Sequence, residues 1–191
     1  MEPVAALPCG YTIFARLAMS GQSLRYGMIL YREVALDSNR RFAHEARMTV
    51  WFHETLDLEA LTANGANCMP GFVGIEFVDY GDNWIKARMP VDERTKQPYG
   101  RLHGGASVVL AETVGSVAAA MTVDQTKFAT VGMEINANHI RPVKDGFVFA
   151  TATSESIGRT TQIWSIRIED EAGKLVCISR ITMAVISTDR A

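Results

Sequence analysis

One stretch of the sequence limits most strongly what this chain can fold into. Over residues 101–121, apolar and small residues follow one another without the alternation of a strand and without proline. Leu, Ala and Met favour helix, so we expect a helix that starts at about Gly104. Because this segment is apolar nearly all round and rich in Ala, Gly and Ser, the helix should be buried and should let neighbouring backbones come close.

Glu112 carries the single charge of this helix beyond its first turn. A buried carboxylate without partners costs several kcal/mol, so Glu112 should either be paired by an arginine or face a cavity. At the other end, Gly104 and Gly105 offer backbone N–H groups that no Cβ blocks, with the positive end of the helix dipole behind them. Such a helix start can hold a developing oxyanion.

The segments around the helix alternate as strands do. Before it, a short helix over residues 57–64 is followed by two antiparallel strands centred on Ile75 and Ala87. After it, four more strands are expected, over residues 129–140, 147–154, 161–168 and 175–186. This order predicts an α+β domain in which an antiparallel sheet wraps the helix.

Two details of these strands are also predicted. In the first strand after the helix, four alternating apolar residues should share one face: Val131, Met133, Ile135 and Ala137. His139 and Arg141 continue that face in phase. In the last strand the hydrophobic phase changes near Ser179, which suggests a bulge there.

Composition narrows the possible functions. The 191 residues are 48% apolar and 21% charged, which allows one good core. The net charge of −2 gives no basic footprint, so no nucleic-acid partner is expected. Three cysteines without CxxC spacing indicate reduced thiols of a cytoplasmic protein, with no metal site. No apolar run approaches the roughly 18–20 residues of a membrane span, so no membrane partner is expected.

Residues 1–47 differ from the rest of the chain. They contain six arginines and no lysine, and their apolar residues follow no sustained period. The arginines interrupt any secretory signal, and the acidic residues argue against a transit peptide. We therefore expect a domain over residues 48–191, preceded by an extension that is poorly ordered or results from an over-called start codon. Alternatively, residues 26–34 form an extra strand or helix on the domain surface.

Four sequence blocks, in order, resemble a known family. They are Met-Pro-Val-Asp (89–92), Thr-Lys-Gln-Pro-Tyr-Gly (95–100), His-Gly-Gly-Ala-Ser-Val-Val-Leu-Ala-Glu (103–112) and Gly-Met-Glu-Ile-Asn-Ala-Asn-His (132–139). Together they resemble the hotdog-fold acyl-CoA thioesterases of the PaaI-like type. The resemblance covers about residues 48–187. It is closest to the subgroup with the dihydroxynaphthoyl-CoA thioesterase of menaquinone synthesis and the enterobactin proofreading thioesterase.

The resemblance implies roles for individual residues. Glu112 would be the catalytic carboxylate, as nucleophile or as general base toward water. The Gly104 N–H would polarise the thioester carbonyl. Gln97 and His103 would help to place the thioester or the water, and Ser116 would orient the carboxylate. Residues that would bind CoA or the acyl group are Gly132, His139, Ile140, Arg141, Pro142, Gly158, Arg159 and Thr160. No metal or other cofactor is implied.

Several of these residues also have plainer explanations. His103 could be a helix cap, and His139 a satisfied core histidine. Gln97 could be a solvated loop residue, and Ser116 could be present because a small residue permits close helix packing. Arg159 could be a surface charge, since residues 158–162 form the block least like the family.

Helix geometry adds an expectation about assembly. Gly104 and Glu112 are eight residues apart, or about 12 Å along one helix. A thioester carbon must lie roughly 3 Å from both the N–H donor and the carboxylate, so one helix cannot supply both. Two antiparallel helices can, and we expect a homodimer, or a dimer of dimers, with active sites at the interface.

The sequence therefore predicts a thioester hydrolase acting on an acyl-CoA or aryl-CoA, with dihydroxynaphthoyl-CoA as the best single candidate and an aryl carrier protein as a possible partner. A hotdog hydratase or dehydratase is one alternative, although the block that would carry its catalytic histidine is not recognisable. A non-catalytic acyl-CoA-binding protein is another, although it would lack Glu112. Fold alone does not decide among these.

Overall fold

The structure of this chain is a computed structural model, which describes residues 49–188. The extension predicted for residues 1–47, and the alternative strand or helix within it, lie outside the described residues. The proposed domain boundary near residue 48 coincides with the start of the described part, and it stays a prediction.

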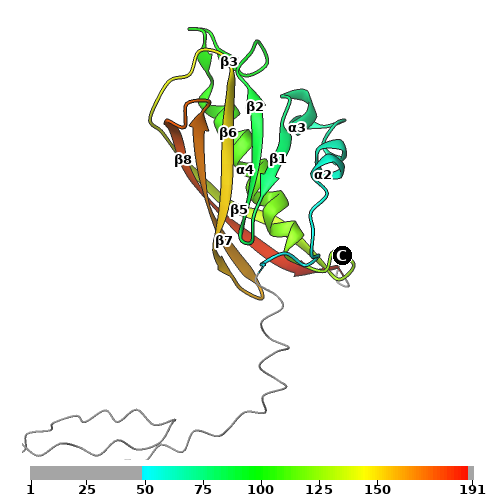
Figure 1. The fold of residues 1–191 in the computed structure, drawn as a ribbon. Coiled ribbons are helices and arrows are strands. Elements are labelled where there is room, and N and C mark those ends of the chain that lie inside the picture. Colours follow the sequence, from blue (N-terminus) through cyan, green and yellow to red (C-terminus); the bar gives the residue numbers. More distant parts are fainter. Residues whose placement is uncertain (1–48, 189–191) are drawn as a thin grey trace, which may run out of the picture. The chain divides into compact units, whose positions relative to one another are not determined.

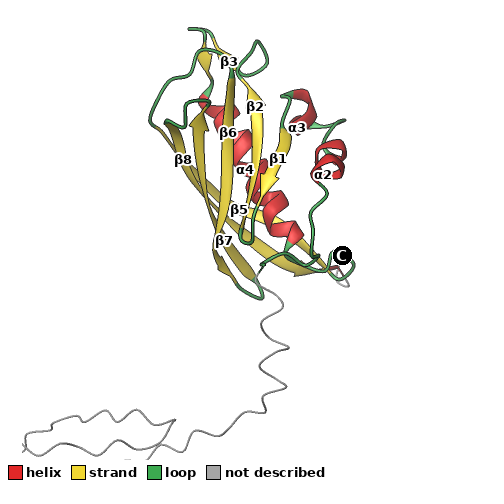
Figure 2. Cartoon of the chain, viewed as in Figure 1, coloured by secondary structure: helices red, strands yellow, loops and turns green. Residues whose placement is uncertain are grey.

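The elements follow the predicted order (Figures 1 and 2). Three helices are described: α2 (Leu58–Asn64), α3 (Met69–Phe72) and α4 (Gly104–Met121). The strands are β1 (Glu76–Tyr80), β2 (Trp84–Pro90), β3 (Lys96–Gln97), β4 (Arg101–Leu102), β5 (Phe128–His139), β6 (Phe147–Ile157), β7 (Thr161–Asp170) and β8 (Leu175–Ser187). The four strands expected after the long helix are confirmed within three residues at each end.

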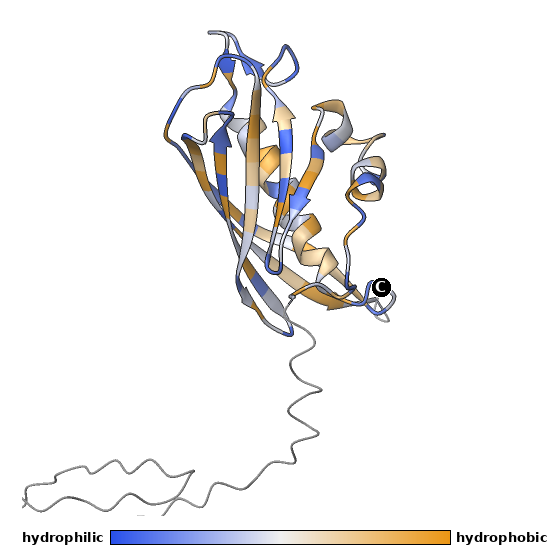
Figure 3. Cartoon of the chain, viewed as in Figure 1, coloured by the Kyte–Doolittle hydropathy of each residue, from blue (hydrophilic) through white to orange (hydrophobic). Residues whose placement is uncertain are grey.

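Six strands form one antiparallel sheet in the order β1-β2-β6-β7-β8-β5. The long helix α4 crosses one face of this sheet and contacts β2, β5, β6, β7 and β8 (Figure 1). Figure 3 shows apolar residues along α4 and polar residues around the β3 end of the molecule. β5 is an edge strand, because β8 is its one neighbour among the described strands.

The small residues of α4 permit close contact with the sheet. A Cβ at Gly115 would lie 2.6 Å from Cγ2 of Ile181 on β8, so only glycine fits there without displacing that side chain. On length and composition alone, α4 is the one helix in residues 49–188 that could cross a membrane. Packing against the sheet accounts for the apolar composition of α4, as in the core helix of a globular domain.

The last turn of α4 is tied to the sheet by buried polar groups. Trp164 Nε1 donates to Gln162 Oε1 at 3.0 Å, and Gln162 Nε2 donates to Thr122 Oγ1 at 2.8 Å. The ring of Trp51 stacks on Trp164 with 6.0 Å between ring centroids. Because each buried donor has a partner, this network fixes where the helix ends relative to β7.

The structure corrects the predicted strand faces. In β5 the register to β8 shifts between Gly132 and Glu134, so a bulge at Met133 moves Gly132 onto the face toward α4. Val131 and Met133 are therefore exposed and do not share the inward face of Ile135. In β8 there is no bulge at Ser179, which is buried and regularly paired. The shift lies near Val176, where Ile168 pairs with Cys177 and Glu169 with Leu175.

Two smaller differences concern the first half of the domain. Residues 69–72 form the short helix α3, so β1 starts at Glu76, later than the alternation from Val73 indicates. The polar connector before α4 contains the hairpin β3–β4, in which Gln97 pairs with Arg101. The hairpin turns at Gly100, whose φ of 69° is a conformation that glycine adopts readily.

Candidate active site

The first turn of α4 is capped by its own preceding histidine. His103 is the N-cap residue, and its Nδ1 accepts the Gly105 N–H at 2.8 Å. The His103 carbonyl accepts the N–H groups of Ala106 and Ser107. Within residues 49–188, the Gly104 N–H has no hydrogen-bond acceptor. Of the two glycine donors expected here, Gly104 is thus the one free to bind a ligand oxygen.

A cavity of about 320 Å³ lies at this start of α4. Six of the predicted site residues line it: Gln97, Gly104, His139, Ile140, Arg141 and Pro142. Four further residues complete the lining: Arg101, Leu102, Ser107 and Val176. The size is within the range of small-ligand pockets. The cavity therefore groups the expected carbonyl-polarising donor with four of the eight expected substrate-binding residues.

His139 and Gln97 occupy defined positions in this cavity. A Cβ at Gly104 would lie 2.9 Å from Nε2 of His139, so the imidazole lies directly against the start of the helix. His139 is exposed, so it is not the buried core histidine of the plainer explanation. Gln97 Oε1 accepts the N–H of Tyr99, which holds the glutamine side chain within its hairpin.

Glu112 lies elsewhere, in the middle of α4. The residue is half-buried, and Ser116 Oγ donates to its Oε1 at 3.2 Å, as the one-turn spacing predicted. A Cβ at Gly132 would lie 2.7 Å from the same Oε1, so the carboxylate rests against the bulged backbone of β5. No described basic side chain pairs with Glu112, so the explanation by an arginine partner has no support in this part of the chain.

The two groups face different positions of β5. Gly104 lies against His139, and Glu112 lies against Gly132, seven residues earlier on the strand. Along the helix their separation is about 12 Å. Within one protomer, the free N–H and the carboxylate therefore cannot reach the same thioester carbon.

The turn between β6 and β7 is also remote from the cavity. Gly132 pairs with Met183, Met183 with Gln162, and Gln162 with Ile157, so these four residues form one row across the sheet. The predicted CoA-binding residues Gly158, Arg159 and Thr160 follow directly after this row. His139 lies about 23 Å farther along β5, at the opposite end of the sheet.

A cysteine beside the cavity is poorly suited to act as a nucleophile. Cys177 pairs with His139 across β5 and β8, and its side chain is fully buried. This burial raises the pKa of the Cys177 thiol, which disfavours the thiolate that a nucleophile needs. Glu112 remains the better candidate for the attacking group or its base.

Sequence reasoning missed Arg101 and Ser107 as cavity residues. Ser107 lies one turn after Gly104, so the helical period could have placed it on the same face. Arg101 could have been found from its place two residues before the N-cap, had the β3–β4 hairpin been recognised. Arg101, from the connector, and Ser107, from the first turn of α4, line the same cavity.

Similarity to known proteins identifies the family. Residues 99–177 match the family model described as "Thioesterase superfamily". A putative esterase of Pseudomonas aeruginosa is 48% identical over 139 residues, which are 73% of this chain and 95% of that protein. The chain belongs to the thioesterase superfamily. It is a thioester hydrolase with the hotdog fold, as the four sequence blocks indicated.

Two other relatives carry more specific names. The 1,4-dihydroxy-2-naphthoyl-CoA hydrolase of Escherichia coli is 49% identical over 131 residues, covering 69% of this chain and 96% of the relative. A proofreading thioesterase of Cronobacter turicensis is 44% identical over 131 residues, covering 69% and 95%. Both belong to the subgroup that the sequence blocks resemble, so that identification is confirmed.

Solved structures agree with the fold. A Pseudomonas aeruginosa thioesterase variant superposes with a TM-score of 0.71 at 47% identity, covering 73% of this chain and 99% of the other. A Staphylococcus aureus relative, 39% identical, was solved as two variants with TM-scores of 0.60 and 0.59. These cover 62% and 61% of this chain and 98% and 96% of theirs. One variant replaces a glutamate by alanine and the other a glutamine, 15 positions apart in the sequence.

Proposed function

We propose that this thioesterase hydrolyses an acyl-CoA or aryl-CoA thioester at an interface between two copies of the chain. The observation that supports this proposal most is the separation of Gly104 and Glu112 within one protomer. They lie against two positions of β5, His139 and Gly132, that are seven residues apart. Our best candidate substrate is 1,4-dihydroxy-2-naphthoyl-CoA, the substrate named for the Escherichia coli relative. An aryl-loaded carrier protein is the second donor to test. The free thiols of Cys68 and Cys177 are compatible with a cytoplasmic location.

The edge strand β5 supplies a route to dimerisation. It is long, none of the other strands in residues 49–188 pairs with its outer side, and Val131 and Met133 are 47% and 64% exposed. Such an edge tends to pair with another strand. A two-fold axis near Ile135 and Asn136, midway between Gly132 and His139, would bring Gly132 of one protomer beside the partner subunit's His139. The free N–H of Gly104 would then face the partner subunit's Glu112.

The same symmetry reunites the predicted CoA-binding residues. The turn with Gly158, Arg159 and Thr160 directly follows the row of paired residues that contains Gly132. Because the two-fold axis would place Gly132 beside the partner subunit's His139, it would also bring this turn toward the partner subunit's His139. Residues 139–142 of one protomer and 158–160 of the other would then lie along one groove. Arg141 and the partner subunit's Arg159 could each hold a phosphate through charge-assisted hydrogen bonds.

The chemistry is a transfer of the acyl group to water. The Gly104 N–H, at the positive end of α4, would stabilise the negative charge that develops on the carbonyl oxygen. Glu112 either attacks the carbonyl carbon and is later released by water, or takes a proton from the attacking water. In both routes a C–O bond forms and the C–S bond breaks. The thiolate of CoA leaves and takes up a proton, and the acid is released.

Spacing supports the roles of Gln97 and Glu112. They are 15 residues apart here, as are the glutamine and glutamate that were substituted in the Staphylococcus aureus relative. Gln97 lines the cavity beside Gly104, where an amide can place the thioester or the water. Ser116 would keep the Glu112 carboxylate oriented through the bond to Oε1.

Thiol release tests the proposal. The substrates are 1,4-dihydroxy-2-naphthoyl-CoA, benzoyl-CoA, a medium-chain acyl-CoA and an aryl-loaded carrier protein. Glu112→Gln keeps the size of the side chain and removes its charge, and kcat should fall at least about a hundredfold. Glu59→Gln, on the exposed surface of α2 and away from β5, is the matched control and should keep full activity. A fully active Glu112→Gln variant would remove Glu112 from the reaction.

A further inference from the structure

The cavity at the start of α4 contains two guanidinium groups and no carboxylate. Arg101 comes from β4, and Arg141 comes from the segment after β5. The other lining residues carry no acidic side chain. Among residues 49–188, every ion pair involves other residues, so neither arginine has a carboxylate partner there. The cavity therefore carries an excess of positive charge.

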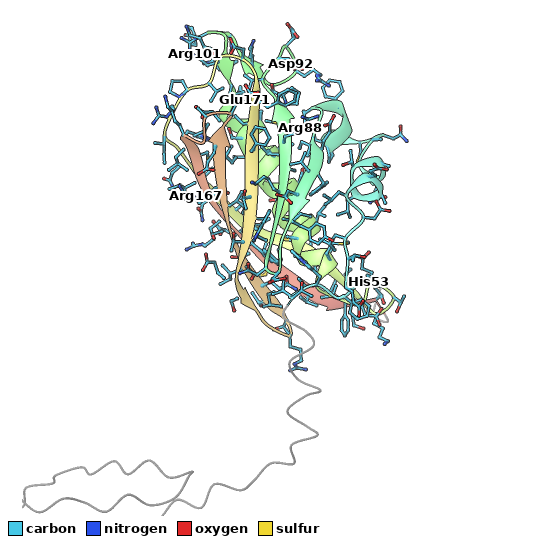
Figure 4. The ribbon with its side chains drawn as sticks, viewed as in Figure 1. His53, Arg88, Asp92, Arg101, Arg167 and Glu171 are labelled. Atoms are coloured by element: carbon cyan, nitrogen blue, oxygen red, sulfur yellow. The ribbon has the colours of Figure 1, made fainter. Side chains whose placement is uncertain are left out.

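Both arginines keep donors free. Arg101 Nη1 makes one long contact, 3.4 Å to the carbonyl of Gly100, and Arg141 Nε donates to the carbonyl of Leu175 at 3.3 Å. A guanidinium has five N–H donors, so most remain available to a ligand. Figure 4 shows Arg101 and Asp92 at the same end of the molecule. Asp92 does not neutralise Arg101, because it is bound to Arg94 at 2.6 Å.

The helix adds a third source of positive potential. The free Gly104 N–H lines the same cavity, and the dipole of α4 points its positive end there. Like charges that share a small space repel one another. Their repulsion is relieved when an anion binds between them, and guanidinium groups bind carboxylates and phosphates through paired hydrogen bonds.

We propose that Arg101 is a specificity-determining residue that, together with Arg141, binds an anionic group of the thioester substrate. This inference deepens the proposed function and rests on it for the identity of the ligand as a thioester. The anion is a phosphate of CoA or a carboxylate on the acyl part, since a guanidinium binds both in the same way.

Three thioesters separate the two sources of the anion. Benzoyl-CoA carries phosphates, benzoyl-N-acetylcysteamine carries no charge, and 4-carboxybenzoyl-N-acetylcysteamine carries a carboxylate alone. KM is measured for the wild type, Arg101→Gln and Arg101→Lys. The control is Arg180→Gln, which removes an exposed arginine whose β8 neighbours Ser179 and Ile181 are buried, so that its side chain faces away from α4. Arg101 makes no ion pair in the described part, so its replacement should leave the fold intact.

The expected result is a rise in KM of about tenfold or more for an anionic thioester in Arg101→Gln, with KM for neutral benzoyl-N-acetylcysteamine unchanged. A rise for benzoyl-CoA assigns the anion to a phosphate, and a rise for the carboxybenzoyl thioester assigns it to the acyl part. Arg101→Lys should show a smaller rise in KM, because lysine keeps the positive charge but lacks the planar guanidinium that forms two parallel hydrogen bonds. KM values within about twofold of wild type for all three thioesters, or an equal rise for the neutral one, would overturn the inference.

A binding measurement separates this inference from the proposed reaction. Titration calorimetry with free CoA and with terephthalate, in Glu112→Gln and in Glu112→Gln/Arg101→Gln, needs no turnover. Weaker binding of one of these anions in the double variant supports the anion site even if Glu112 proves dispensable for hydrolysis. Equal affinities of both anions for the two variants count against Arg101 whatever the outcome for Glu112.

Discussion

Glu112 and Gly132 touch across the interface between α4 and β5, with a distance of 2.7 Å from Oε1 to the place a Cβ would occupy. Gly132 reaches this position because of the bulge at Met133. The carboxylate therefore has a fixed resting place that depends on a missing side chain. The relationship gives Gly132 a second possible role, in positioning Glu112, beside the substrate contact that the family resemblance implies.

Gly132→Ala should lower kcat without lowering stability. The added methyl group would meet the far end of a flexible side chain, so Glu112 can move aside at little cost in folding free energy, but it loses its position. We expect kcat to fall about tenfold or more and the melting temperature to stay within about 2 °C.

Gly115→Ala is the matched comparison for that experiment. Its Cβ would lie 2.6 Å from the branched side chain of Ile181 in the core, which cannot move freely. Overpacking of this kind costs about 1–3 kcal/mol, so this variant should melt at a lower temperature. If Gly132→Ala also melts early, its loss of activity reflects the fold and not the carboxylate.

Gly104→Pro removes one N–H donor and adds a Cβ that meets His139. Gly104 is the first residue of α4, where proline is well tolerated, and His103 has the extended backbone that suits a residue before proline. If this N–H polarises the carbonyl, kcat should fall about 10²–10³-fold. Gly104→Ala keeps the N–H and brings the same Cβ against His139, so it should lose much less activity. Equal losses in both variants would point to the contact with His139 as the cause.

His103 acts on the helix through its cap. Replacement by alanine should cost about 0.5–2 kcal/mol of stability, while asparagine can still accept a hydrogen bond from the first turn and should cost less. We expect His103→Asn to retain both stability and most activity in urea unfolding and thiol-release assays. A stable but inactive His103→Asn would show that the imidazole takes part in the reaction.

Asp124 links stability to acid pH. Hydrogen bonds from Lys127 and Thr126 lower the pKa of this carboxyl to about 2. Because the folded-state pKa is lower than the ordinary value, the contribution is complete above about pH 4 and is lost as the pH falls toward 2. Melting temperatures of the wild type and Asp124→Asn should therefore differ above pH 4 and converge near pH 2. A constant difference across this range would argue against the linkage.

Local patterns predicted most of the fold. Alternating hydrophobicity located β2 and the strands after α4, and the lack of alternation together with helix-favouring residues located α4. The predictions failed where the register between strands that are distant in sequence determines which face a side chain occupies. The bulge at Met133 depends on pairing with β8, which is 50 residues away, and the alternation of Val131 and Met133 contains no sign of it.

The candidate site was predicted in parts. Blocks of sequence identified Gly104, Gln97, His139 and Glu112, but their spacing along the chain could not show that Glu112 rests on Gly132. Arg101 was missed because a two-residue strand has no measurable period. The contacts that position these residues come from tertiary packing, which a single sequence does not display.

Mixing two inactive variants tests most directly whether each active site draws on two chains. Glu112→Gln and Gly104→Pro are purified separately, unfolded and refolded together in equal amounts, and thiol release is compared with that of each variant refolded alone. Statistical pairing gives half mixed dimers, each with one intact site, so the mixture should recover about a quarter of wild-type activity. A mixture no more active than its two components would show that Gly104 and Glu112 of different chains do not meet, and it would contradict the shared site.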